Sequence, residues 1–366
     1  MIDHPTGSLA SYPHHSGLPS FCSCIFGRMM GSQNDGATTT TDDTPKTSSR
    51  ISLSLCVTWL AVMILTLAAH TLRADDARGR FYDQLRQRQL FGLVESDCLM
   101  RLAGRSLSVR DRSDLTLELS RTYAAHAWQT IGAEQDDLWQ RGQQVLSPFL
   151  EQSPKSARHE LFETQWALID LSRAEWLLAQ SELRVDDRTL KQKGLLATQA
   201  AIERLSQLES MLNKETRAAA AGSASGNKVG DKTGKPTNEK PDAPLTPYER
   251  RTLSQQIRFR WGTARLVQSK LSEPGSADRA AAIVAADELL SPLAAGTVGE
   301  RLTSESLILL AEVARLRGDL DRESRVLNSI EKSLAVDATN DLRERFVIER
   351  VRWWLAKRQP AEAAAA

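Results

Sequence analysis

The stretch ARLRGDLDRESRVL, residues 314–327, shows how this chain folds. Gly318 and Asp319 separate two runs of residues that favour helix, with leucines and alanines recurring at helical spacing. Glycine readily ends a helix, and aspartate is a favoured N-cap for the helix that follows. The stretch therefore predicts one helix near 299–317, a tight turn, and a second helix near 319–335.

The same arrangement occurs 43 residues earlier in the chain. GSADRAAAIV (275–284) aligns with GDLDRESRVL (318–327), with glycine on glycine, Asp-Arg on Asp-Arg, and Ala281 on Ser324. Self-similarity at such a period is typical of a stacked helical array. We expect the two small residues, Ala281 and Ser324, to lie where neighbouring helices cross closely.

An alanine-rich helix, a Gly-Asp turn, an apolar residue and a small residue four positions later resemble the tetratricopeptide-type (TPR) repeat. Residues 299–335 match best and 247–296 next, with weaker likeness at 90–103 and 112–152. The repeat is longer than is usual for that family, and leucine replaces most aromatic landmarks. The resemblance implies an all-α fold of antiparallel helical hairpins stacked as a TPR-like α-solenoid; a generic helical hairpin bundle shares most of these features.

The composition also favours helices and does not suggest nucleic-acid binding. The 366 residues are 41% hydrophobic and 25% charged, and Leu, Ala, Arg, Glu and Gln dominate. The formal net charge is only +1. Because neutralising phosphates requires a clustered basic surface, we expect no nucleic-acid partner.

The amino-terminal region predicts export. Residues 1–50 are polar and predict a disordered leader, and ISLSLCVTWLAVMILTLAA (51–69) is an apolar run behind basic residues. With the small residue that ends LRA, the segment 51–74 fits either a signal peptide or a membrane anchor. Met29 and Met30 are alternative start sites. Positive charge before the apolar run predicts that the rest of the chain is exported.

The predicted location is the periplasm or the bacterial cell envelope, with possible membrane attachment through residues 51–69. Three of the four cysteines precede Asp75, so cleavage would leave only Cys98 and no internal disulfide. An exported protein without disulfides fits a bacterial envelope better than a small secreted scaffold.

The rest of the chain divides into four parts. They are a helical repeat segment, a low-complexity flexible linker, TPR-like repeats and a disordered tail, at 75–216, 217–245, 246–358 and 359–366. Helices are expected near 79–104, 112–131, 134–151, 155–183, 186–216, 247–272, 277–291, 299–317, 319–335 and 340–358. The prolines of LSPFL (146–150) and LSPLA (290–294) are expected to end helices.

No motif carries recognisable chemistry. HELFE (159–163) lacks the second histidine of a zinc-protease motif, and predicts a solvated helix face instead. GDKTGKP (230–236) lacks the glycine spacing and hydroxyl residue of a phosphate-binding loop. His126 and His159 are expected to be helix-surface or semi-buried residues and not catalysts. We therefore assign no catalytic, metal or cofactor residue and expect a protein that is not an enzyme.

Two stretches are candidates for partner binding. RRTLSQQIRFRW (250–261) carries Arg258 and Arg260, which could pair with an acidic peptide; alternatively it is a charged outer face with Trp261 in the core. Near the carboxyl end, Trp353 and Trp354 either form a docking surface or pack back onto the preceding helices.

Taken together, these features predict an exported, non-catalytic scaffold that binds a protein or peptide partner through TPR-like repeats. Two alternatives remain open. The chain could be a membrane-tethered structural protein of the envelope, held by residues 51–69. It could also be the helical accessory region of an enzyme.

Overall fold

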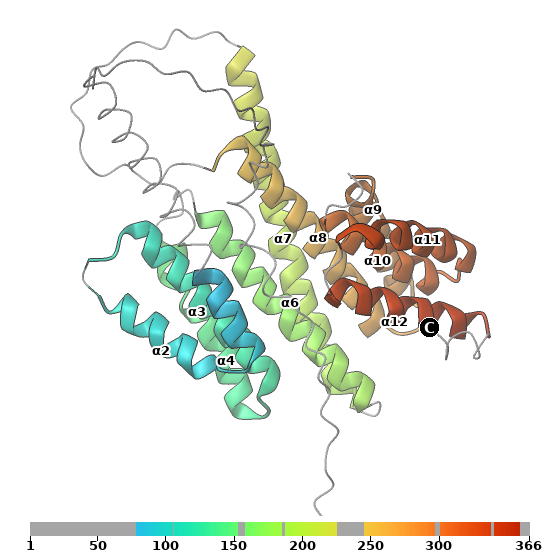
Figure 1. The fold of residues 1–366 in the computed structure, drawn as a ribbon, viewed down its shortest axis with the longest axis horizontal. Helices are drawn as coiled ribbons and strands as arrows, with labels where there is room; N and C mark the ends of the chain where they lie inside the picture. The colour runs from blue at the N-terminus through green and yellow to red at the C-terminus, as the bar shows by residue number, and fades with distance from the viewer. Residues whose placement is uncertain are drawn as a thin grey trace, which may run out of the picture.

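The computed structural model is all-helical in the part of the chain that it describes, as expected (Figure 1). The described residues are 78–104, 106–152, 158–184, 187–224, 245–296, 301–337 and 340–358. The expected leader, signal or anchor segment and tail (1–50, 51–74 and 359–366) lie outside these residues. So does most of the expected linker.

The helices follow one another along the chain, with short connections except between α7 and α8, where residues 225–246 intervene. They are helix 78–87, α2 (Phe91–Leu102), α3 (Val109–Gln129), α4 (Ala133–Gln144), α5 (Ser147–Gln152), α6 (His159–Leu183), α7 (Arg188–Ala224), α8 (Pro247–Leu271), α9 (Ala277–Ala294), α10 (Arg301–Leu316), α11 (Leu320–Asp337) and α12 (Asn340–Ala356). Helix α7 continues to Ala224, beyond the boundary expected at residue 216.

The turn that first suggested the fold has the predicted geometry. Gly318 adopts a left-handed backbone with φ 77°. Its N–H donates to the carbonyl of Arg315, and the N–H of Asp319 donates to that of Ala314, each at 2.9 Å. This is a Schellman ending. The Asp319 carboxylate accepts the backbone N–H of Arg322 at 2.9 Å, so the predicted N-cap is confirmed.

The equivalent turn between α8 and α9 shares the left-handed glycine and the N-cap but not the Schellman ending, because α8 already ends at Leu271 and the Ser276 N–H donates to the carbonyl of Glu273 at 3.1 Å. Gly275 has φ 79°, and the Ser276 hydroxyl accepts the backbone N–H of Arg279 at 3.2 Å. The expected small-residue crossing is wrong, however. Ala281 is exposed and Ser324 only half-buried. One residue along α9 corresponds to about 100° around its axis, which turns Ala281 away from the buried face.

Two further expectations are corrected. The helix expected over 79–104 is two helices, because Gln89 takes a left-handed φ of 59° and ends the first one. There the N–H of Leu90 donates to the carbonyl of Leu85 at 2.9 Å, as in a Schellman ending. Pro292 lies inside α9 instead of ending it. It sits in the last turn, where few residues follow and little helix is lost.

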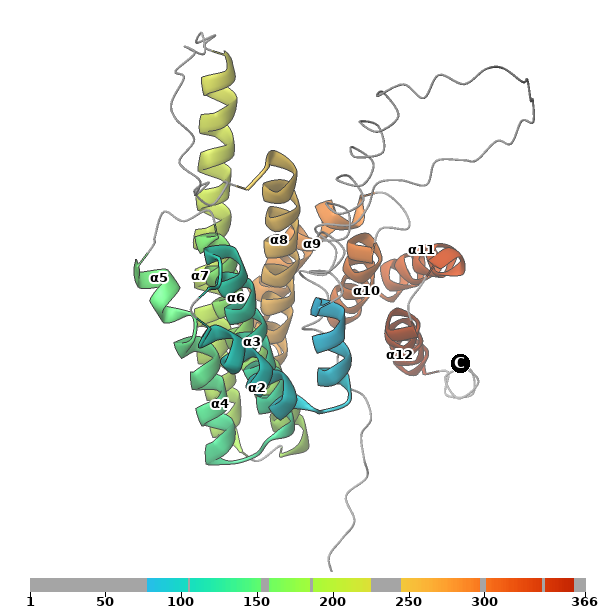
Figure 2. The same ribbon diagram turned by 60° about the vertical axis from the view of Figure 1, so that its left-hand side comes forward.

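Each long helix packs against the next, and alternate helices also touch. Contacts join α3 to α6, α6 to α8, α8 to α10, and α10 to α12. Figure 1 shows α2–α4 and α9–α12 on opposite sides of α6–α8, and Figure 2 shows α6, α7 and α8 side by side. None of the described helices is long and apolar enough to span a membrane.

Close crossings occur at glycines that the repeat pattern did not single out. A Cβ added to Gly262 of α8 would lie 2.7 Å from Leu290 Cγ of α9. A Cβ on Gly194 of α7 would lie 2.9 Å from Leu271 Cδ1 of α8. Because real side chains do not approach so closely, these glycines set the distance between the central helices.

Candidate partner-binding site

The two arginines predicted to bind a partner do not share one exposed surface. Arg258 pairs through Nε with Glu209 of α7, which also accepts the Ser254 hydroxyl at 3.0 Å. Arg260 is only 4% exposed, and its guanidinium lies 5.3 Å from the centroid of the Phe259 ring. Residues two apart on a helix point about 200° apart, so they meet different neighbours.

The tryptophans pack back onto the preceding helices. Trp353 is buried and donates from Nε1 to the carbonyl of Leu320 at 3.1 Å. Its ring centroid lies 4.4 Å from that of half-buried Trp354, and Lys357 Nζ lies 4.4 Å from the same ring. Trp261 is likewise packed against the core, as the alternative interpretation of its stretch required.

The structure brings together a set of charges that the sequence analysis missed. We call it the α10–α12 charge cluster; its three carboxylates and three cations come from α8, α10, α11 and α12. Its members are Lys270, Glu312, Arg315, Glu323, Glu349 and Arg352.

Arg315 occupies the centre of this cluster. Its Nη2 lies 3.4 Å from Glu312 Oε1 and 3.5 Å from Glu349 Oε2. Lys270 Nζ lies 2.7 Å from the same oxygen of Glu312, and Arg352 pairs with Glu349 one turn away. The chain of ion pairs therefore ties α8, α10 and α12 together.

The buried charge of Glu323 on α11 is the least compensated charge of the cluster. Its side chain is fully buried, and its Oε1 lies 3.8 Å from Arg315 Nε. Neither of its oxygens has a hydrogen-bond partner among the described residues. Burial raises the pKa of Glu323 to about 7, while Arg315 opposes this shift and Glu349 and Glu312 add to it. This carboxyl group therefore titrates near neutral pH.

The other two glutamates differ in their electrostatic balance. Burial acts to raise the pKa of Glu312, but Lys270 and Arg315 outweigh it, so the pKa is lowered. Burial raises the pKa of Glu349, and the charge of Glu312 adds to that rise. Glu312 therefore stays ionised to a lower pH than Glu323 or Glu349.

The cations of the cluster are partly exposed to solvent, whereas its carboxylates are buried. Arg352 is 50% exposed and Lys270 28%, whereas Glu323 is 0% exposed and the other two glutamates are nearly buried. A carboxylate from outside would meet guanidinium and ammonium groups first. Arginine pairs with carboxylates through charge-assisted hydrogen bonds, so the geometry suits an acidic ligand.

A second buried charge group joins the first helices. Arg86 donates to Glu118 at 2.9 Å and to Thr122 at 3.1 Å, linking helix 78–87 to α3. Arg121 pairs with the same Glu118 and reaches Gln165 of α6 at 3.5 Å. Buried charges therefore bridge alternate helices at both ends of the described chain.

One sequence signal could have pointed to both groups. Glutamate and arginine three residues apart recur on three helices, as ELSR (118–121) on α3, EVAR (312–315) on α10 and ERVR (349–352) on α12. In each stretch the two side chains form an ion pair. Residues three apart are neighbours on a helix surface.

The remaining candidate residues have structural partners. His126 Nδ1 lies 2.8 Å from Glu95 Oε1, and its ring stacks on Phe91. In HELFE, Glu163 pairs with Arg204 of α7. Leu161 and Phe162 of the same motif are buried, so this part of α6 is not the solvated face that we expected.

Cys98 has the environment of a core residue. It is fully buried, and burial raises the pKa of its thiol to about 12. A thiol in such surroundings is a poor nucleophile at neutral pH.

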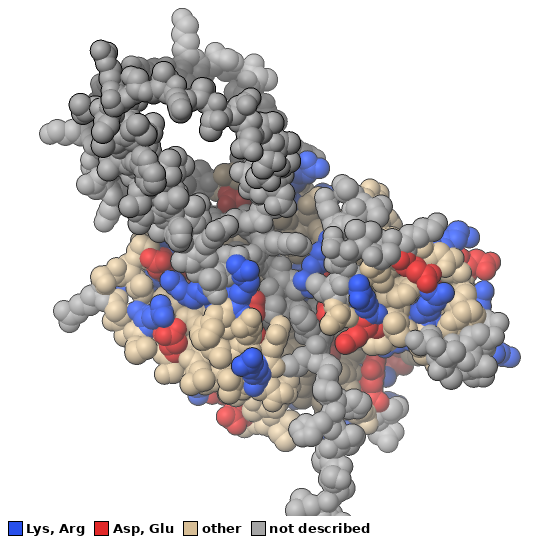
Figure 3. Space-filling model, viewed as in Figure 1, with Lys and Arg blue, Asp and Glu red and all other residues tan. Residues whose placement is uncertain are grey.

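Among the described residues, no group of three or more His, Cys, Asp or Glu side chains is placed to hold a metal ion. On the face shown in Figure 3, basic and acidic residues are interspersed. Comparisons with protein-family models, curated proteins and solved structures give no match.

Proposed function

We propose that the chain is an exported, non-catalytic interaction scaffold, a TPR-like α-solenoid that binds an acidic protein or peptide segment at the α10–α12 charge cluster. The observation that carries this proposal is the asymmetry of the cluster. Arg352 and Lys270 face solvent, whereas the glutamates that hold them are buried. Cations held by buried glutamates at a helical surface suit recognition of carboxylates.

Two features support the solenoid. The turns at Gly275 and Gly318 repeat backbone conformation and capping at a spacing of 43 residues. Alternate helices from α3 to α12 also contact one another in chain order, as helices of one layer in a stacked array would. Such arrays bind partners along an extended surface, so the ligand would be a peptide or a partner helix.

Of the four residues that the sequence predicts as partner contacts, Arg258 and Trp354 keep part of their surface exposed, and Arg260 and Trp353 are buried. We therefore move the proposed contact from the Arg258–Arg260 stretch to Arg352 and Lys270. The buried residues Arg260 and Trp353 would support the packing around the site without contacting the ligand.

Export is supported by the apolar run 51–69 behind basic residues. The same run supports a second candidate function, a structural envelope protein held at a membrane. Mass spectrometry of the chain from its native cell distinguishes them, since a product that begins near Asp75 has lost the anchor.

The partner site is tested by photocross-linking in the native cell. A photoreactive amino acid replaces Ala356, which is exposed one turn beyond Arg352, and in a control it replaces Arg343, exposed near the start of α12. We expect one partner to cross-link at position 356 and not at 343.

The partner recovered in this way is then titrated against charge-reversed chains. We expect Arg352→Glu to weaken binding about 10-fold or more, because losing a charged pair costs roughly 1.5–3 kcal/mol. Arg343→Glu makes the same change in charge on the same helix and should leave the affinity unchanged. Equal loss for both variants would mean that general charge, not this cluster, attracts the partner.

A further inference from the structure

Helix α2 has an apolar face that points away from the core. Val94 and Cys98 of α2 join Tyr82 in the main core cluster, and α3 packs against the same side. On the other side, Leu93 is 59% exposed and Met100 69%. The exposed uncharged residues of this surface, which we call the α2 face, are Gly92, Leu93, Ser96, Leu99, Met100 and Ala103.

The sequence that contains the α2 face is rich in arginine. Residues 78–112 contain eight arginines and four acidic residues, a net charge of +4, although the whole chain carries only +1. The four carboxylates of this stretch have neighbouring partners, and Arg86, Arg101 and Arg110 also form ion pairs, Arg110 with Asp114. The contacts are Asp83 with Arg86, Glu95 with His126, Asp97 with Arg101, and Asp111 with Ser108.

We infer that the α2 face lies on the surface of an anionic membrane, with Leu93, Leu99 and Met100 entering the headgroup region. Apolar side chains flanked by arginines are what a surface-bound helix presents to anionic lipid. Single exposed leucines are common on soluble proteins, but here three large apolar side chains share one uncharged helix face.

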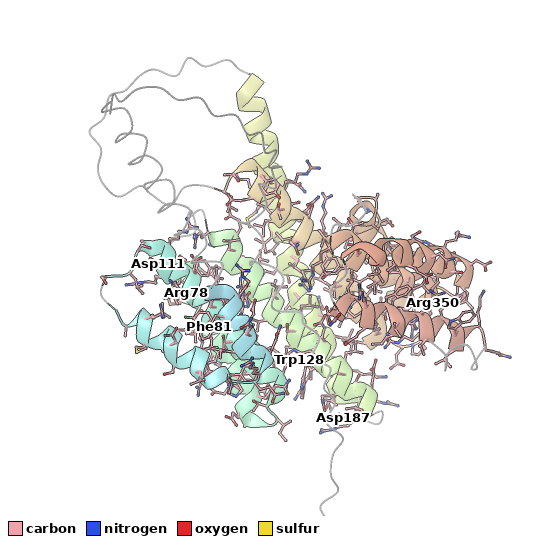
Figure 4. All side chains as sticks on the ribbon, viewed as in Figure 1. Arg78, Phe81, Asp111, Trp128, Asp187 and Arg350 are labelled. Carbon is pink, nitrogen blue, oxygen red and sulfur yellow. The ribbon has the colours of Figure 1, made fainter. Side chains whose placement is uncertain are left out.

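The position of the apolar run 51–69 argues for lipid over a second copy of the chain. Only residues 70–77 separate that run from Arg78, and eight extended residues reach about 30 Å at most. If 51–69 is held in a bilayer, α2 is within reach of its surface. In Figure 4, Arg78 and Phe81 mark helix 78–87, which precedes α2 in the chain.

This inference goes beyond the proposed scaffold function and uses other residues. The test uses the full chain in vesicles of phosphatidylcholine with phosphatidylglycerol. Cys22, Cys24 and Cys56 are replaced by serine, and the buried Cys98 is kept. An environment-sensitive fluorophore is placed at Leu93→Cys or Met100→Cys, and at Val284→Cys of α9 as the control. All three positions are exposed, so the fold should be kept.

We expect spin-labelled lipid to quench the fluorophore at positions 93 and 100 several-fold more than at 284. Leaving out phosphatidylglycerol should reduce that difference. Equal quenching at all three positions would overturn the inference. So would disulfide-linked dimers of the unlabelled Leu93→Cys chain under oxidising conditions. Neither position 93 nor position 100 belongs to the α10–α12 charge cluster. A failure of partner binding would therefore leave the quenching unchanged. The two proposals can thus fail independently.

Discussion

Gly275 and Gly318 hold the same left-handed backbone conformation, φ 79° and 77°, at equivalent points of two turns that are 43 residues apart. Gly132, before α4, has φ 78°, and Gln89, before α2, has φ 59°. The turns at Gly275 and Gly318 therefore share a left-handed glycine followed directly by an N-cap, whereas Gly132 has a ψ of −151° and a different backbone conformation. Each of these residues lets the backbone reverse direction with little chain, which brings successive helices into contact.

Replacing either turn glycine by alanine should destabilise the fold. A left-handed backbone costs an L-residue with a Cβ about 1 kcal/mol, so Gly275→Ala and Gly318→Ala should each lower the free energy of unfolding by roughly that amount. No atom crowds the Cβ position at either glycine, so the loss reports backbone conformation alone. Urea unfolding followed by circular dichroism measures it.

Gly92→Ala is the matched control. Gly92 is helical, exposed and free of neighbours within 4 Å of an added Cβ. Alanine favours helix over glycine, so the free energy of unfolding should stay the same or rise by no more than about 1 kcal/mol. A loss at Gly92 as large as that at Gly318 would show that the turns are not specially constrained.

The crossing of α8 and α9 predicts a steric effect. Gly262→Ala places a methyl group where Leu290 Cγ would be 2.7 Å away. Overpacking of this kind should lower the free energy of unfolding by about 1–3 kcal/mol. If steric conflict is the cause, combining it with Leu290→Ala should cost less than the sum of the two single losses. The comparison needs the original chain, the two single variants and the double variant. If the two losses simply add in the double variant, steric conflict is excluded as the cause.

Local chemistry made much of this fold predictable. The Gly-Asp turn and the N-cap at Asp319 follow from the conformational freedom of glycine and the short acceptor of aspartate. The break at Gln89 could not be foreseen, because glutamine seldom takes a positive φ and only the surrounding packing holds it there. Pro292 was misjudged because its position within the last helical turn is not visible in sequence.

The candidate site was less predictable than the fold. Lys270 and Arg352 are far apart in the chain, and only the packing of α8, α10 and α12 brings their partners Glu312 and Glu349 together. The recurring Glu-x-x-Arg spacing was a usable signal, but it states which residues pair within a helix and not which helices meet. Arg260 was chosen for its charge, although its burial is a property of tertiary packing.

The link between α9 and α11 tests the role of side-chain shape. Both oxygens of Asp287 accept from Arg322 at 2.7 Å, and Arg317 lies 2.6 Å away. Arg322→Lys keeps the charge but loses the two-pronged contact, so unfolding should become easier by about 1 kcal/mol at neutral pH. Arg325→Lys, an exposed change on the same helix, should have little effect. Equal effects of the two changes would rule out a special role for the two-pronged contact between Arg322 and Asp287.

The same link has a pH dependence of definite sign. The hydrogen bond from Arg322 lowers the pKa of Asp287 below its ordinary 3.8. Its stabilising contribution is therefore complete above that value and is lost as the pH falls through the lower folded pKa. Asp287→Asn should lower the free energy of unfolding at neutral pH, and this difference should shrink in strong acid. A difference that stays constant in acid would contradict the ion pair.

Glu323 should show the opposite pH dependence. Its pKa is about 7 in the folded protein, against an ordinary 4.5, so the folded state holds the proton more tightly than the unfolded chain. The contribution of this group to the free energy of unfolding is highest at low pH, falls as the pH rises between those two values, and stays low above them. Glu323→Gln, which stays neutral, should be more stable than the original chain at about pH 8, by no more than about 3 kcal/mol.

At about pH 4 the two proteins should be nearly equal in stability, because Glu323 is then largely protonated in both the folded and the unfolded chain and resembles glutamine in shape and charge. Urea unfolding at both pH values gives the difference, in which the titration of all other groups largely cancels. Glu344→Gln, an exposed change on α12, provides the baseline. A Glu323→Gln difference that does not grow between the two pH values would show that Arg315, at 3.8 Å, fully compensates the buried charge.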